Sequence, residues 1–291
     1  MLKTKLHKAG FIITSFMLMA AASGNNKNTV AEIKMVSSVA TEDSLSATKH
    51  VFDTAGLCIC LPELSAAEMV NAPRIRLQEQ ARTYVQAHLR ENAFYYDKIK
   101  AKKGAVFTLI DKVFTEFQVP VEMKYLAVVE SKLDSRISSS AGAAGLWQFM
   151  PVPAKSFGLR INGKQDDRRN DYKSTVAAAK CLLYLQGIFD DWLLTLAAYN
   201  SGPGKVQSAI RKSGSRNYWK LEKWLPAETR NHVKKFISVH YHFEGHGSLV
   251  TMTKDETMAH TNAVSHFRHK HENTDDSLNA GAETPGSSGQ R

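Results

Sequence analysis

Glu130 is the carboxyl group in this chain best placed for acid–base chemistry. It follows the apolar run Tyr-Leu-Ala-Val-Val, which is typical of a buried helix end. Burial and the negative end of a helix dipole both favour the neutral, protonated form of a carboxyl group. A carboxyl group in that form can act as a general acid near neutral pH. Taken alone, however, Glu130 is better explained as a surface glutamate at a helix end.

Polar and aromatic side chains follow Glu130 in an order that could line a cleft around it. Ser139 stands in a loop of small residues, and Trp147 and Gln148 come directly after that loop. Tyr199 and Asn200 end a later apolar run, just before Ser-Gly-Pro-Gly. An acid beside hydroxyl, amide and aromatic groups is typical of a sugar-binding site. Each residue also has a structural explanation, since an Asn before Gly often caps a helix and a Trp is often buried.

The elements that must position these groups are predicted to be helices. Apolar residues recur every three or four positions between Pro73 and about Phe243. Ser174 is the predicted N-cap of the helix that follows it. No alternating apolar–polar run is long enough to predict a sheet. The predicted helices cover residues 73–89, 107–117, 121–131, 175–189, 190–200, 205–212 and 227–243.

The two ends of the chain differ in composition from this helical part. Residues 1–22 carry early lysines, an apolar run and three alanines, which predicts a cleaved secretory signal peptide. That run is too short to span a membrane, and no cysteine nearby suggests a lipid anchor. We expect a poorly ordered linker at 23–72, N-terminal helices at 73–118, a catalytic core at 119–245 and a disordered polar tail at 246–291.

The chain is basic, with 38 Lys and Arg against 28 Asp and Glu in 291 residues, a formal net charge of +10. Residues 202–245 hold nine Lys or Arg and three acids. A basic surface favours an anionic partner, and export makes nucleic acid a poor candidate. We therefore expect an acidic cell-wall polymer. Neither the three cysteines nor the histidines of the tail have zinc-ligand spacing, so no metal or other cofactor is expected.

Four motifs, in this order, resemble those of the lysozyme-like lytic transglycosylases, the SLT group of glycoside hydrolase family 23. The resemblance is to the branch of the membrane-bound lytic murein transglycosylases D, and it covers roughly residues 74–243. The motifs are Glu130-Ser131, the Gly-Leu-Trp-Gln-Phe-Met-Pro run at 145–151, Ala-Tyr-Asn-Ser-Gly at 198–202 and Leu-Pro-Ala-Glu-Thr at 225–229. Several motifs at compatible spacing are far more specific than any one of them.

The resemblance implies a mainly α, lysozyme-like domain of the goose-type lysozyme kind, acting on peptidoglycan in the periplasm. Glu130 would be the single acid/base that cleaves the MurNAc–GlcNAc β-1,4 bond and forms 1,6-anhydro-MurNAc. Its partners would be glycan strands, with other cell-wall machinery as a further candidate. The C-terminal LysM repeats common in this branch are not seen in the sequence. The implied substrate-binding residues are Ser139, Gln148, Met150, Tyr199 and Asn200.

Two other functions stay open at this point. A hydrolytic muramidase would need a second carboxylate to activate water. Asp134 is four residues from Glu130, and Asp166, Asp167 and Asp171 are further candidates. A catalytically silent glycan-binding protein is the other alternative, and the presence of Glu130 argues against it.

Overall fold

The computed structural model describes residues 50–52, 58–60 and 73–280, which belong to two separate units. One unit contains a short antiparallel hairpin of β1 (His50–Phe52) and β2 (Cys58–Cys60), with Val51 opposite Ile59. The predicted signal peptide and the other residues of the predicted linker lie outside the described part. The second unit contains every element from residue 73 onward.

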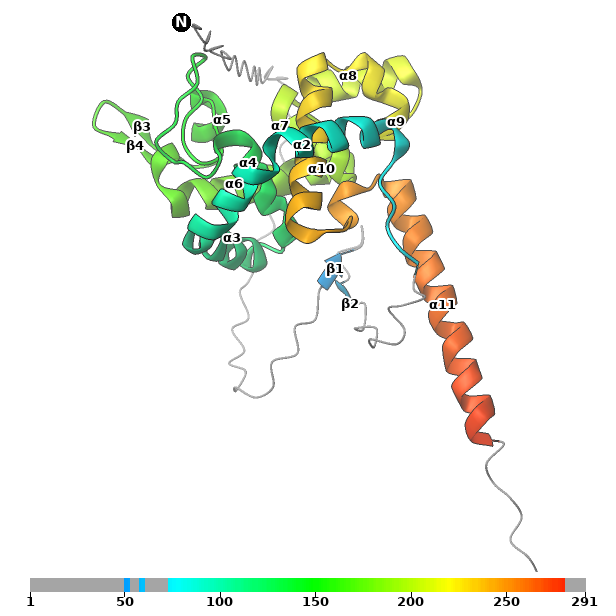
Figure 1. Ribbon diagram of the computed structural model, residues 1–291. Coiled ribbons are helices and arrows are strands. Elements are labelled where there is room, and N and C mark those ends of the chain that lie inside the picture. Colours follow the sequence, from blue (N-terminus) through cyan, green and yellow to red (C-terminus); the bar gives the residue numbers. More distant parts are fainter. Residues whose placement is uncertain (1–49, 53–57, 61–72, 281–291) are drawn as a thin grey trace, which may run out of the picture. The chain divides into compact units, whose positions relative to one another are not determined.

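The second unit is built from helices, which confirms the mainly α prediction (Figure 1). Its only strands among the described residues are β3 (Ile161–Asn162) and β4 (Gln165–Asp166), a two-residue antiparallel pair. Short 3-10 turns, labelled η, join several of the α-helices. The helices are α2 (Glu79–Lys102), α3 (Gly104–Glu116), η1 (Val121–Lys124), α4 (Tyr125–Ser131), α5 (Pro151–Ser156), η2 (Asp167–Arg169), α6 (Asp171–Phe189), α7 (Trp192–Ser201), α8 (Pro203–Ser213), α9 (Tyr218–Leu221), η3 (Glu222–Trp224), α10 (Ala227–Glu244), η4 (Leu249–Thr251) and α11 (Lys254–Ala280).

Helix α7 forms the centre of the core. Every residue from Leu193 to Ser201 is buried, and α7 packs against α6, α8 and α10. Truncating a large aliphatic side chain in such a place typically costs about 2–5 kcal/mol. Helix α4 is short and almost fully buried, and it also packs against α10. The ends of α4 and α7 are therefore held against one shared neighbour, α10.

Two helix starts differ from the predictions by four residues or more. The first long helix begins at Glu79 rather than at Pro73. Helix α6 begins at Asp171 with Asn170 as its N-cap, because the Asn170 side chain accepts a hydrogen bond from the Lys173 backbone N–H. The prediction that Ser174 is the N-cap was wrong, since Ser174 lies buried inside the first turns of that helix.

The disordered tail predicted from residue 246 was also wrong as far as Ala280, because η4 and α11 occupy that segment. One local contact and two tertiary contacts hold the start of α11. Glu256 accepts hydrogen bonds from the Thr253 backbone N–H at 2.7 Å and from the Trp219 indole at 3.4 Å. The Lys254 backbone N–H donates to Asp191 at 2.7 Å. The start of α11 is therefore fixed to the core.

The helical unit contains no single helix, within its described residues, that is long and apolar enough to cross a membrane. Helices α6 and α7 pass that test only as a pair, and they meet at a bend of 118°. Nor does the described part of the chain hold a group of three or more His, Cys, Asp or Glu side chains placed to bind a metal ion.

Candidate active site

Glu130 lies at the end of α4 with only 5% of its side chain exposed. The helix ends there because Lys132 and Leu133 adopt left-handed backbone angles, with φ of 57° and 59°. Oε1 of Glu130 lies 2.9 Å from Nε2 of His232 on α10, whose side chain is 9% exposed. The other oxygen, Oε2, has no hydrogen-bond partner among the described residues. One carboxyl oxygen is thus held by the protein, and the other is available to a ligand.

Ser131 fixes the end of α4 to the loop that carries the next motif. Its hydroxyl lies 2.7 Å from the Leu146 carbonyl oxygen and 3.1 Å from that of Ala127, one turn back in α4. Because Ser131 is buried, water does not compete for these contacts. The neighbour of Glu130 is therefore a positioning residue for both the helix end and the loop.

The loop at residues 138–149 is held by a buried arginine. The Arg168 guanidinium donates hydrogen bonds to the carbonyl oxygens of Gly142, at 2.7 Å, and Phe149, at 3.0 Å. Asp166 pairs with the same guanidinium at 2.8 Å. Gly145 has φ of 82°, and a Cβ atom there would lie 1.8 Å from the Arg168 carbonyl oxygen. Only glycine fits this close approach of two backbone segments.

Three predicted substrate-binding residues lie in or beside this loop. Gln148 is buried and has φ of 47°, and its amide NH₂ donates to the Gly145 carbonyl at 2.8 Å. Its Oε1 is buried without a partner among the described residues. The half-buried Ser139 hydroxyl accepts a hydrogen bond from the Ala143 N–H at 3.0 Å and so closes its own turn. Met150, half-buried, is the N-cap of α5.

Tyr199 and Asn200 lie at the end of α7, where both are buried. The Tyr199 hydroxyl donates to the Trp147 carbonyl at 2.8 Å, so it holds the loop and is not bonded to Glu130. Burial, with smaller contributions from Cys181 and Glu130, raises the pKa of Tyr199 well above its ordinary value. The contribution of Glu130 shows that the two side chains are electrostatic neighbours.

Asn200 and two aromatic residues take structural roles that the sequence left open. The Asn200 side-chain oxygen accepts a hydrogen bond from the Thr229 hydroxyl of α10 at 2.9 Å, which joins α7 to α10 beside the site. The Trp147 indole is fully buried and donates to Thr175 at 3.0 Å. Phe149 is buried as well. These two rings belong to the core and do not form a stacking surface for a ligand.

Sequence reasoning missed His232 and Lys235. Both lie on α10, and burial lowers the pKa of Lys235, while Glu130 raises it and Lys132 lowers it further. The available signal was weak. His232 follows Thr229, the end of the fourth motif, by three residues, so the two share one face of a helix.

Three of the four carboxylates proposed for a hydrolase are held in ion pairs. Both oxygens of Asp134 bond to Arg136, at 2.9 and 3.0 Å, and these bonds lower the pKa of Asp134 to about 2. Asp166 pairs with Arg168, and Lys173 holds the pKa of Asp167 well below its usual range. Within the described part of the chain, none of these groups, nor Asp171, bonds to Glu130.

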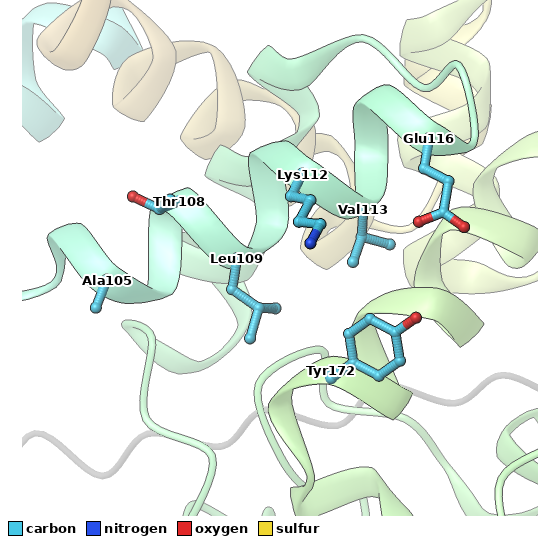
Figure 2. Close-up of a pocket in the computed structure, with 7 residues that line it drawn as sticks. All are labelled: Ala105, Thr108, Leu109, Lys112, Val113, Glu116 and Tyr172. Carbon is cyan, nitrogen blue, oxygen red and sulfur yellow. The ribbon is translucent and has the colours of Figure 1, made fainter. Parts of the chain in front are cut away.

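A pocket of about 490 Å³ lies apart from these residues, between α3 and the start of α6 (Figure 2). Tyr172 of α6 lies opposite the face of α3 that carries Leu109 and Val113. The pocket includes Glu116 but none of the predicted site residues. The Glu116 carboxylate therefore provides an internal control for experiments on Glu130.

The chain is similar to proteins that are named as transglycosylases. Over 169 residues the chain is 35% identical to membrane-bound lytic murein transglycosylase D of Escherichia coli strain K12, covering 56% of this chain and 36% of that protein. It is 33% identical over 119 residues to peptidoglycan transglycosylase gp16 of Escherichia phage T7, covering 40% of this chain and 9% of that protein. The chain thus spans about a third of the length of the first relative.

A solved structure and a family model complete the comparison. The 70 kDa soluble lytic transglycosylase Slt70 of Escherichia coli is 20% identical, with a TM-score of 0.45 over 59% of this chain and 32% of that one. Residues 114–222 match the family model described as the transglycosylase SLT domain. This part of the chain is therefore similar to the transglycosylase SLT domain.

Proposed function

We propose that this protein is a lytic transglycosylase that cleaves the MurNAc–GlcNAc β-1,4 bond of peptidoglycan and leaves 1,6-anhydro-MurNAc. The observation that carries the proposal is Glu130, a buried carboxyl group with one oxygen held by the protein and the other available. It stands in the first of four family motifs, and Ser131 joins it to the second. We assign the catalytic core to residues 119–245.

The chemistry needs one carboxyl group that acts twice. Protonated Glu130 gives its proton to the glycosidic oxygen as the bond from that oxygen to C1 of MurNAc breaks. The substrate's N-acetyl oxygen or the Ser139 hydroxyl dipole stabilises the cationic C1. Glu130, now a carboxylate, takes the proton of the C6 hydroxyl as O6 bonds to C1. The proton is restored to Glu130, and no water is consumed.

The neighbouring residues would orient the glycan strand. The unpartnered Oε1 of Gln148 is a buried acceptor, and a ligand N–H or O–H that reached it would satisfy it. Met150 offers a half-buried apolar contact, and Asn200 lies at the end of α7 beside Thr229. Tyr199 acts indirectly, since its hydroxyl is used to hold the Trp147 carbonyl.

The proposed place of action is the periplasm, at the cell envelope. The predicted signal peptide and the printed name of the Escherichia coli relative, a membrane-bound murein transglycosylase, support it. The basic segment 202–245 would face the anionic wall polymer. A hydrolytic muramidase is less well supported, because three of the four candidate aspartates are held by Arg136, Arg168 and Lys173.

The test is digestion of purified peptidoglycan by the chain from residue 23 onward, with mass spectrometry of the released muropeptides. We expect anhydro products, reduced at least about 10²-fold in Glu130→Gln because general acid–base catalysis is lost. Glu116→Gln, a matched change in the pocket at α3, should leave the product yield unchanged. Reducing-end products would identify a hydrolase instead. Binding of peptidoglycan without cleavage would identify a silent glycan-binding protein.

A further inference from the structure

His232 is the one described side chain that forms a hydrogen bond with the Glu130 carboxyl group. The contact joins Nε2 to Oε1 at 2.9 Å, across 102 positions in the sequence. Both side chains are more than nine-tenths buried. A hydrogen bond between two groups so well shielded from water restricts the rotation of the carboxyl group strongly.

The other ring nitrogen of His232 indicates which form of the imidazole fits this place. Nδ1 is buried and has no hydrogen-bond partner among the described residues. A bare ring nitrogen is an acceptor, whereas a protonated one is a donor that must be satisfied. The neutral form with its proton on Nε2 therefore fits best. That form donates to Oε1 whether Glu130 is a carboxylic acid, with its proton on Oε2, or a carboxylate.

The surroundings of the pair are rich in cations. Lys235 on α10 interacts electrostatically with Glu130, with Lys132 after α4 and with His88 on α2. Tyr199 on α7 interacts electrostatically with Glu130. Glu91 on α2 acts on His88, and Glu228 is a further charge on α10. A positive charge on His232 would add to that of Lys235 beside Glu130 and would favour the carboxylate form of Glu130.

We propose that His232 is a positioning residue that holds Glu130 through Oε1, so that Oε2 is the oxygen that exchanges the proton with substrate, and that cleavage requires His232 in its neutral form. The inference rests on the proposed function. Protonation of the imidazole would keep Glu130 as a carboxylate, which cannot donate a proton to the glycosidic oxygen. The cleavage rate should therefore fall where the imidazole becomes charged, on the acid side of the pH profile.

The test compares His232→Gln and His232→Phe with the unchanged protein by kcat, KM and anhydro-product yield between pH 5 and 8. Glutamine can donate an N–H to Oε1 but does not titrate, so we expect kcat within about tenfold of the unchanged protein and no acid-side fall. Phenylalanine cannot donate, so we expect kcat about 10–100-fold lower with KM little changed.

The matched control is His242→Gln. His242 also lies on α10 and contacts a carboxylate, Asp97, at the same 2.9 Å, but away from Glu130. Its substitution should leave kcat and the pH profile unchanged. An acid-side fall in His232→Gln equal to that of the unchanged protein would overturn the inference. So would a His232→Phe variant with unchanged kcat.

The two proposals fail in different ways. If the unchanged protein releases anhydro products that depend on Glu130, while the His232 variants behave like it, only the role of His232 is refuted. If the unchanged protein releases no anhydro product at any pH, the proposed function is refuted, and this inference with it. Thermal melting of each variant separates a folding defect from a catalytic one, and His232→Gln decides the matter where His232→Phe does not fold.

Discussion

Replacing Gly145 by alanine tests whether the loop beside Glu130 depends on one close contact between backbones. The added Cβ would lie 1.8 Å from the Arg168 carbonyl oxygen and 2.6 Å from its carbonyl carbon. Neither atom belongs to a flexible side chain, so the Arg168 backbone itself must move. That movement would disturb the guanidinium that holds Gly142 and Phe149.

The expected loss of stability has two parts. Alanine at φ of 82° is strained by about 1–2 kcal/mol. Relieving the overlap adds about 1–3 kcal/mol, as is typical of overpacked sites. The total is about 2–5 kcal/mol, a large fraction of the ~5–15 kcal/mol that stabilises an ordinary domain.

Gly142→Ala separates the two parts. Gly142 lies in the same loop with a similar φ of 90°, and a Cβ there would meet nothing within 4 Å. Only the backbone strain of about 1–2 kcal/mol is therefore expected. Urea unfolding followed by circular dichroism gives both free energies, and peptidoglycan cleavage should fall much further in Gly145→Ala. Equal losses of stability in the two variants would refute the argument from close approach.

Two more substitutions test contacts beside Glu130 and Asn200, and a third tests how stability depends on pH. Thr229→Val removes the 2.9 Å hydrogen bond to Asn200, and we expect a loss of about 1–2 kcal/mol in urea unfolding together with a lower kcat. Ser131→Ala leaves the Leu146 carbonyl without its 2.7 Å partner, with a similar loss expected; unchanged stability would refute this role of the hydroxyl. Burial raises the pKa of Asp191 to about 6, so the folded protein binds more protons than the unfolded chain between pH ~4 and ~6. The free energy of unfolding should therefore fall by up to about 3 kcal/mol as pH rises through that range, and Asp191→Asn should remove this part of the pH dependence in urea melts.

Periodicity predicted the central helices well because they are buried by packing. The run from Thr175 to Phe189 lies in α6, and the predicted last helix at 227–243 matches α10 to within a residue. Periodicity carries no information about caps supplied from elsewhere in the fold. The segment at 246–280 was predicted to be disordered from its polar composition, yet its first turn is fixed by Asp191, Trp219 and Glu256.

At the candidate site, too, neighbouring residues in the sequence predict some features, and others depend on contacts between distant residues. Glu130 could be predicted because its apolar neighbours and its motif adjoin it in the sequence. The partner of its carboxyl group could not, because His232 lies 102 positions away and reaches Glu130 only where α4 and α10 pack together. Tyr199 shows the converse: its motif predicts that it is a site residue, but only the structure shows that its hydroxyl holds the Trp147 carbonyl. A motif therefore predicts which residues belong to a site, whereas the role of each residue depends on contacts between helices. The difference between direct and indirect roles is what the His232 variants measure.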